Sequence, residues 1–302
     1  MLAITQQTFG GPEVLEIVEV DRPSAGPGEV VVRVAATGMN AADWKLRSGL
    51  VRKLGDPPFT LGFDVSGIVD EVGAGVERFQ LGDEVYGMVL SRSGGYAEYV
   101  VAQADILAPK PAIIDHIHAA ALPTAVLTAW QGLAGVVAGQ RVLVHAAAGG
   151  VGHFAVQLAK DRGAYVIGTA RAAKHEFLRE LGADEVIDYT TTDFADAVRD
   201  IDLVFDLVGG AYGSRSLPVL RAGGRLIDAQ GNDAEDDPRY ERLYVSPSGN
   251  DLRDIADLLE HGRLRVEIDQ VLPMAEVVKA HQLSESGRVR GKIVLVPWNS
   301  PA

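Results

Sequence analysis

The stretch between residues 141 and 163 carries two hydrophobic periods in succession. Residues 141–146 form a short run that becomes apolar and then small, as in a buried parallel strand. From residue 151 onward, apolar residues recur three or four positions apart, as on one face of a helix: Val151, Phe154, Ala155, Leu158 and Ala159. Gly163 is then placed to end this helix.

The turn between this strand and helix has the spacing of the dinucleotide fingerprint G-x-G-x-x-G, with Ala147 in the first place. A side chain at Gly149 would hold the backbone away from a pyrophosphate, and one at Gly152 would push the helix off the sheet. A tight turn without a ligand is the alternative. A second strand at 164–169 supplies the context that the motif requires. The residues expected to bind the cofactor here are Ala148, Gly149, Gly150, Val151 and Gly152.

Strands and helices continue to alternate beyond this unit. We expect strands at 185–188, 201–208 and 224–229. The helices between and after them are expected at 173–181, near 211–221 and at 251–260. This alternation predicts an open parallel sheet with helices on both sides.

The first 110 residues follow another pattern. Short alternating or β-branched runs are separated by glycine and proline turns, which favours a barrel or sandwich. These early strands are expected at 14–20, 29–35, 67–72 and 84–89. A short helix is expected at 40–47, and Pro123 divides two more helices within 118–137.

Near the end of the sequence we expect a helix at 274–285 and a strand at 292–296. This last segment should return to the first domain. The cleft between the two domains is then the expected substrate site.

The composition and net charge exclude several kinds of partner and binding site. The 302-residue chain has a net charge of −13 and no basic cluster, which argues against nucleic acid and anionic membranes. It has no cysteine, so disulfides and thiolate zinc sites are excluded. The N-terminal apolar run is too short for a signal peptide, and no stretch approaches a membrane span. We expect a cytoplasmic protein.

Several motifs occur together, in order, over nearly the whole chain. The chain resembles the medium-chain dehydrogenase/reductase superfamily, and most closely its zinc-free quinone oxidoreductase branch, which includes zeta-crystallin. The resemblance implies an α/β protein. A GroES-like β-barrel domain would span 1–115, completed by 274–302, and a doubly wound Rossmann domain that binds NADPH would span 116–273. It also implies a homodimer. The motifs are GMNAADWKLRSG at 38–49, LGFDVSGIVDEV at 61–72, GGYAEYVV at 94–101, LPTAVLTAWQGL at 122–133, AAGGVG at 147–152 and RVRGKIVL at 288–295.

The resemblance also bears on metal binding. In zinc-dependent relatives, cysteine falls at the positions of Asn40 and Thr124, and histidine at that of Phe63. Zinc prefers nitrogen and sulfur ligands, and phenylalanine supplies neither. We therefore expect no metal site.

The segment after the second strand suggests which nicotinamide cofactor binds. A carboxylate that grips the ribose 2′-hydroxyl of NAD is expected about 20 residues after the glycines. This region instead holds Arg171 and Lys174, which could pair with a 2′-phosphate. An ordinary solvated basic pair at a helix start is the alternative. The sequence therefore predicts NADPH.

Five further residues complete the expected cofactor site. In the resembled family, Asn40 would lie beside the nicotinamide and substrate, Thr128 near the nicotinamide, and Tyr189 near the adenosine end. Ala170 and Val208 stand at expected strand ends, where ligands gather. Each of three residues has an alternative role. Asn40 could only stabilise its own loop, and Thr128 could be a helical threonine that bonds to the preceding turn. Tyr189 could be an ordinary surface residue.

The resulting hypothesis is an NADPH-dependent enzyme that transfers hydride to quinones or α,β-unsaturated carbonyl compounds. Asn40 would hold the acceptor, and water or a ribose hydroxyl would supply the proton. Asp43 is expected to anchor its loop, and Asp64 to have a structural role or to contact a lysine or arginine. An NADPH-binding sensor without turnover remains the alternative, as does a subunit whose cleft a partner fills.

Overall fold

The computed structural model describes residues 1–298, and the chain divides into two compact units. The first unit comprises Met1–Leu127, Pro247–Gly262 and the chain from Ile268 onward, and the second comprises Thr128–Ser246 and Arg263–Glu267. This division differs from the predicted domains. Residues 116–127, 247–262 and 268–273 fall in the first unit.

The second unit is built on a six-stranded parallel sheet in the order β11-β10-β9-β12-β13-β14. The order reverses between β9 and β12, which is the switch point of a doubly wound sheet. The predicted Rossmann architecture is confirmed. The strands are β9 (Arg141–Val144), β10 (Tyr165–Ala170), β11 (Glu185–Asp188), β12 (Ile201–Asp206), β13 (Leu220–Asp228) and β14 (Tyr240–Arg242).

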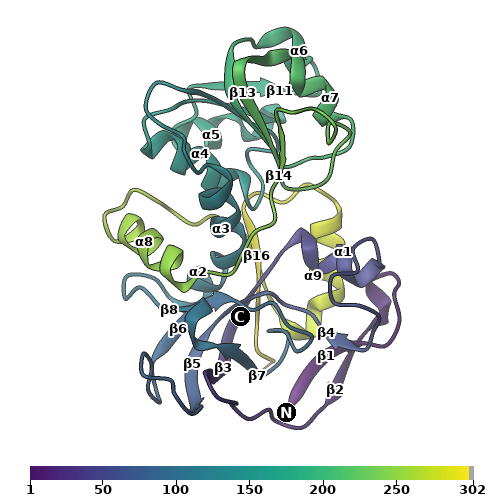
Figure 1. Ribbon diagram of the computed structural model, residues 1–302. Helices are drawn as coiled ribbons and strands as arrows, with labels where there is room; N and C mark the ends of the chain where they lie inside the picture. The colour runs from purple at the N-terminus through teal and green to yellow at the C-terminus, as the bar shows by residue number, and fades with distance from the viewer. Residues whose placement is uncertain (299–302) are drawn as a thin grey trace. The chain divides into compact units, whose positions relative to one another are not determined.

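Helices cover both faces of this sheet, with α4 and α5 on one side and α6 and α7 on the other (Figure 1). A buried cluster joins aliphatic residues of the strands to Phe194, Val198, Val219 and Ala234 outside them. This burial agrees with the nearly unbroken apolar runs of β9, β10 and β12. The helices are α4 (Gly152–Asp161), η3 (Ala172–Lys174), α5 (His175–Glu180), α6 (Phe194–Ala197), α7 (Tyr212–Ser216) and η4 (Leu217–Val219).

The first unit contains a seven-stranded sheet in the order β15-β16-β3-β5-β6-β8, with β7 also pairing with β3. A second, three-stranded sheet has the order β2-β1-β4. This is the predicted GroES-like part. Its strands are β1 (Leu2–Gln6), β2 (Leu15–Glu19), β3 (Glu29–Met39), β4 (Phe59–Thr60), β5 (Asp64–Val72), β6 (Glu84–Met88), β7 (Tyr99–Gln103), β8 (Leu107–Pro109), β15 (Ile268–Pro273) and β16 (Lys292–Val296).

The helices of the first unit include one that the sequence assigned to the other domain. The periodicity of 251–260 correctly predicts a helix, but α8 packs against β8 and η2 of the first unit. Tyr86 Oη, on β6, donates to the Leu252 carbonyl of α8 at 2.7 Å. Helix α3 (Pro123–Gly132) crosses the division between the units. The others are η1 (Pro12–Val14), α1 (Ala41–Ser48), η2 (Ala104–Ile106), α2 (His116–Ala120), α8 (Gly249–Glu260), η5 (Met274–Glu276) and α9 (Val277–Glu285).

The C-terminal strand returns to the first unit, as expected. Ile293 pairs with Met39 and Val294 with Gly38, so β16 lies antiparallel beside the end of β3. This pairing brings the start of β16 to the residue that follows β3.

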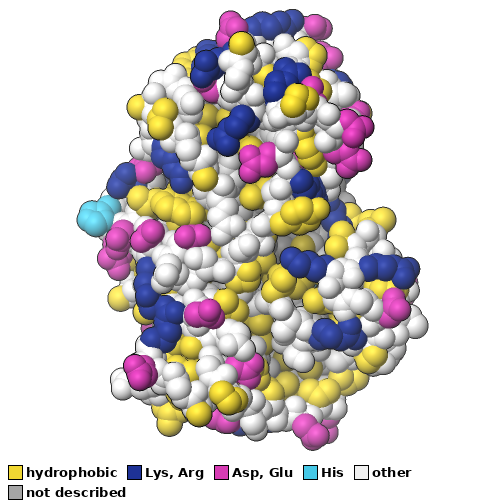
Figure 2. Space-filling view, in the orientation of Figure 1, with side chains coloured by type: hydrophobic (Ala, Val, Ile, Leu, Met, Phe, Trp, Pro, Cys, Tyr) yellow, Lys and Arg dark blue, Asp and Glu magenta, His cyan; other side chains and the backbone are white. Residues whose placement is uncertain are grey.

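Two further features concern the surface. None of the helices within residues 1–298 is long and apolar enough to cross a membrane. On the face shown in Figure 2, basic side chains lie singly or in small groups among acidic ones.

Candidate functional site

The turn after β9 is held by Thr169 of the neighbouring strand. Ala146 adopts a positive φ of 50°, which a residue with a Cβ rarely does. Its N–H donates to Thr169 Oγ1 at 3.2 Å, and the Gly149 N–H donates back to its carbonyl at 3.0 Å. Thr169 is not among the predicted site residues. The feature that could have indicated it is a hydroxyl near the end of the strand beside the glycine turn.

The N–H groups of Gly150, Val151 and Gly152 have no hydrogen-bond acceptor among the described residues. They lie in succession where α4 begins, so they form an anion-binding cradle at a positive helix end. A Cβ at Gly149 would meet only the Ala146 carbonyl, at 3.3 Å, which leaves open space above the turn. These residues therefore fit a pyrophosphate.

Gly152 allows a close approach of backbone to backbone where α4 begins. A Cβ there would collide with the carbonyl oxygens of Ala146 and Ala147, which follow β9 directly. A side chain would therefore force the start of the helix away from the end of this strand. The glycine lets the chain turn tightly enough to aim its N–H groups.

Arg171 and Tyr189 are brought together at the carboxyl ends of β10 and β11. Arg171 Nε donates to Tyr189 Oη at 2.9 Å, and both residues are exposed. Ala170, at the end of β10, is buried. Lys174 lies in the following 3-10 turn and is half-buried. This edge of the sheet thus presents a guanidinium supported by a phenol.

Asp188, which the sequence analysis did not select, anchors the same edge. It ends β11 and accepts hydrogen bonds from the Thr190 hydroxyl at 2.7 Å and N–H at 2.9 Å, and from the Ala172 N–H at 3.1 Å. These bonds, led by that from the Thr190 side chain, lower the pKa of the Asp188 carboxyl. The sequence feature that could have indicated Asp188 is an acidic residue at the end of a short strand that neighbours β10 in the sheet.

The loop that carries Val208 is tied to Asp206, the last residue of β12. Asp206 Oδ1 accepts from the N–H groups of Val208 at 2.9 Å and Gly209 at 3.0 Å, and its Oδ2 accepts from Asn232 Nδ2 at 2.9 Å. Burial raises the pKa of this carboxyl. Val208 itself is 44% exposed, so its side chain is available for contact.

Asn40 follows β3 in the first unit and belongs to a buried polar cluster. Its Nδ2 donates to Asp64 Oδ2 at 2.8 Å, and its Oδ1 accepts from Lys292 Nζ at 2.5 Å. Lys292 also reaches Asp64 Oδ2 at 3.2 Å, which confirms the expected contact between Asp64 and a basic residue. Asp64 Oδ1 accepts from the Thr124 N–H at 2.7 Å and hydroxyl at 2.5 Å. The sequence analysis did not select Lys292.

Asp43 anchors its loop, as expected. Its two oxygens accept from the N–H of Asn40 at 2.8 Å and of Gly62 at 3.0 Å, so it joins the start of α1 to the segment before β5. Complete burial raises the pKa of Asp43 to about 7, although these hydrogen bonds oppose the shift. Each of its oxygens accepts a hydrogen bond from a backbone N–H, so it positions Asn40.

Two other positions singled out from the sequence are buried. Thr128 lies on α3 and is the first residue of the second unit, and Phe63 belongs to the apolar core of the first. Within residues 1–298, no group of three or more histidine, cysteine or acidic residues is arranged to hold a metal ion.

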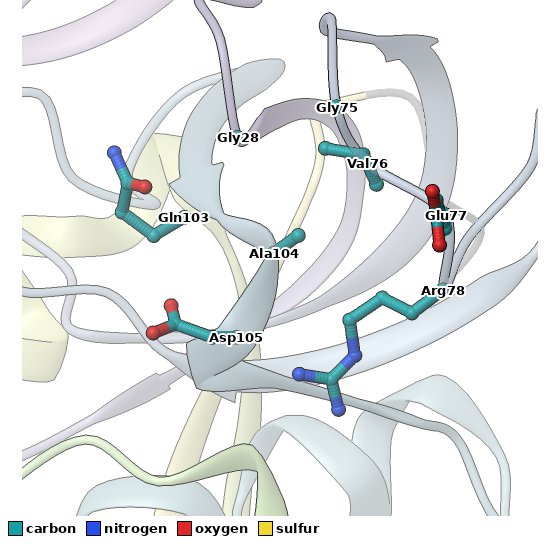
Figure 3. Close-up of a pocket in the computed structure, with 8 residues that line it drawn as sticks. All are labelled: Gly28, Gly75, Val76, Glu77, Arg78, Gln103, Ala104 and Asp105. Carbon is teal, nitrogen blue, oxygen red and sulfur yellow. The ribbon is translucent and has the colours of Figure 1, made fainter.

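A cavity of about 440 Å³ in the first unit contains none of the predicted site residues. Figure 3 shows Gly75, Val76, Glu77 and Arg78 on one wall and Gln103, Ala104 and Asp105 on the other. It lies at the far end of β3, where that strand begins at Glu29, and is therefore separate from the Asn40 cluster.

A doubly wound sheet with a glycine turn that fits a pyrophosphate, joined to a GroES-like unit, is the architecture of an oxidoreductase that uses a nicotinamide cofactor. Family models agree: residues 26–112 match the alcohol dehydrogenase GroES-like domain, and residues 181–295 match a zinc-binding dehydrogenase domain. The chain belongs to the medium-chain dehydrogenase/reductase superfamily, in the quinone oxidoreductase branch that includes zeta-crystallin.

Individual relatives support this assignment. The chain is 35% identical to the 2-methylene-furan-3-one reductase of Solanum lycopersicum, over 98% of this chain and 79% of that protein. It is 34% identical to a chloroplast envelope quinone oxidoreductase homolog of Arabidopsis thaliana, over 98% of each. The quinone oxidoreductase structure from Coxiella burnetii superposes with a TM-score of 0.92 at 37% identity, covering 98% of this chain and 99% of that one.

Proposed function

We propose that this protein is an NADPH-dependent, zinc-independent reductase of quinones or α,β-unsaturated carbonyl compounds. The observation that carries the proposal is Asn40, a half-buried amide that occupies the position of a metal ligand in zinc-dependent relatives. Two buried charged side chains, Asp64 and Lys292, hold it in place. An amide can donate a hydrogen bond to a carbonyl oxygen but cannot replace a Lewis acid.

This difference favours conjugated acceptors. The bound nicotinamide supplies a hydride from its C4 atom. In an enone the β-carbon accepts the hydride, the electron pair moves to the carbonyl oxygen, and a proton from water completes the reduction. Because the charge spreads over the conjugated system, one well-placed donor at Asn40 can assist it. A simple ketone would lack its main electrophilic aid.

Two relatives support the choice of acceptor and cofactor. An Arabidopsis thaliana relative, 33% identical, is named NADPH-dependent alkenal/one oxidoreductase. The quinone oxidoreductase of Escherichia coli, solved in complex with NADPH, superposes with a TM-score of 0.90 at 29% identity, over 98% of this chain and 100% of that one. In this chain, Arg171 is exposed beside Tyr189 and free to meet a 2′-phosphate.

The replacement Asn40→Ala tests the role of the amide. It removes a donor from the acceptor and also a contact from a buried cluster, so a matched control is needed. Thr124→Val removes a hydrogen bond to the same carboxylate, Asp64, and leaves Asn40 in place. We expect both variants to lower the melting temperature, but only Asn40→Ala to reduce turnover by tenfold or more, with unchanged NADPH affinity.

Equal turnover in the two folded variants would show that Asn40 only braces its loop. Tight NADPH binding by the parent without oxidation by any acceptor would instead favour a sensor.

We further propose a cytoplasmic homodimer. The cysteine-free composition is consistent with a reducing compartment, and dimers are common in the resembled family. Sedimentation of the purified protein and fractionation of cells test these two points separately.

A further inference from the structure

Three neighbouring strands converge on Asn40. It follows the last residue of β3, while Asp64 begins β5 and Lys292 begins β16. Since β3 pairs with both β5 and β16, the sheet brings a carboxylate and an ammonium to opposite ends of one amide. Asp64 is fully buried and Lys292 is 2% exposed, whereas Asn40 is only half-buried.

The chemistry of the two partners fixes which way the amide points. An ammonium only donates hydrogen bonds, and a carboxylate only accepts them. The amide oxygen must therefore face Lys292, and the nitrogen must face Asp64, as their distances of 2.5 Å and 2.8 Å show. In the flipped amide, NH₂ would face NH₃⁺ and the oxygen would face a carboxylate.

This arrangement leaves one hydrogen-bonding group of the amide for a ligand. The oxygen is engaged by Lys292, and one N–H by Asp64. The other N–H of Nδ2 remains. Asp64 is itself saturated, because Thr124 donates twice to its other oxygen. Without Lys292, the amide would be held at the nitrogen alone.

We propose that Lys292 is a positioning and specificity-determining residue, which holds the Asn40 amide so that it presents an N–H and not a carbonyl to the ligand. The site then selects substrates that offer a hydrogen-bond acceptor, such as the carbonyl oxygen of a quinone or enone. This inference rests on the proposed function. Lys292 does not itself touch the substrate. Its effect passes through Asn40.

A double-mutant cycle tests this dependence. Lys292→Met should lower kcat/KM for the quinone or enone about tenfold or more, because a misoriented donor stabilises the transition state less. In an Asn40→Ala background, the same change should alter kcat/KM less than twofold, because no amide remains to be oriented. An equal loss in both backgrounds would overturn the proposal and assign Lys292 a general structural role.

A measurement on the unaltered lysine covers the case in which Lys292→Met does not fold. The chain has only four asparagines, so selective ¹⁵N labelling gives four pairs of side-chain amide signals, and replacing the other three asparagines identifies the pair of Asn40. The proton bonded to Asp64 should exchange with water at least tenfold more slowly than its geminal partner. Equally rapid exchange of both protons would overturn the fixed orientation. This readout needs no turnover, so absence of quinone and enone reduction would reject the proposed function alone.

Discussion

Arg171 Nε donates a hydrogen bond to Tyr189 Oη at 2.9 Å, and this contact links the ends of β10 and β11 in the parallel sheet of the second unit. The phenol holds one edge of the guanidinium and leaves its two terminal nitrogens for an anion. A charge-assisted contact of this kind contributes about 1.5–3 kcal/mol, or roughly tenfold or more in affinity.

We therefore expect Arg171→Ala to weaken NADPH binding about tenfold or more and to spare NADH. Tyr189→Phe, which removes only the support, should weaken NADPH binding less. Isothermal titration with both cofactors measures this. Equal losses for NADPH and NADH in Arg171→Ala would show that Arg171 does not contact the 2′-phosphate.

Asp206 supports a second expectation, about stability. Its carboxylate accepts three hydrogen bonds from the loops after β12 and β13. Asp206→Ala leaves these donors unpaired, so the free energy of unfolding should fall by about 2–3 kcal/mol in urea titrations. Asp196→Ala, on the exposed face of α6, is the matched control and should change it by less than about 0.5 kcal/mol. Similar values for both would show that Asp206 does not anchor the loops.

The buried His145 predicts how stability depends on pH. Burial, assisted by the charge of Arg215, lowers the pKa of His145 to about 3. The folded state keeps the ring neutral, while the unfolded chain takes up a proton near pH 6.5. The difference between the folded and unfolded pKa therefore contributes fully to the free energy of unfolding above pH 6.5. As the pH falls toward 3, this contribution is lost by about 1.4 kcal/mol per pH unit.

His145→Gln provides the comparison, because glutamine can still bond to Thr169 and Ser216, the partners of the imidazole. Between pH 6 and pH 4, the free energy of unfolding of the parent should fall more steeply than that of the variant by this amount. Parallel curves from urea titrations at each pH would contradict the assignment.

Metal analysis tests the proposal that the enzyme works without zinc. The resemblance implies that zinc ligands of zinc-dependent relatives fall at Asn40, Phe63 and Thr124, and the buried phenylalanine supplies no ligand atom. The purified protein should contain far less than one zinc per chain, and chelators should leave its turnover unchanged. One tightly bound zinc per chain would contradict this expectation.

Local sequence signals predict much of the fold. Strands β9 and β10, helix α4 and the glycine turn are evident from periodicity, because each is determined by nearby residues. Helix α8 was also evident, but not its partners, because an apolar stripe does not show which sheet it covers. Short edge strands such as β14 were missed, since three residues carry too little pattern.

The residues of the candidate site also divide into those indicated by local sequence and those that only tertiary contacts reveal. The glycines and Asn40 lie within recognisable motifs, and Arg171 stands where a residue that reads the ribose 2′ position is expected. Lys292 also lies within a motif, at 288–295, but its link to Asn40 appears only when the last strand pairs with β3, more than 250 residues earlier. A lysine that begins an apolar strand is usually a solvated end. Only the tertiary structure shows that it is 2% exposed and bonded to an amide.

Isotopically labelled hydride transfer tests the central claim most directly. The purified protein would be given NADPH carrying deuterium at both C4 positions, together with a panel of quinones, enones and simple ketones. We expect oxidation of NADPH with quinones or enones, one deuterium at the β-carbon of the reduced enone, and negligible reaction with simple ketones. If simple ketones are reduced while quinones and enones are not, or if the deuterium does not reach the product, the account of Asn40 as a metal-free hydride-transfer site is wrong.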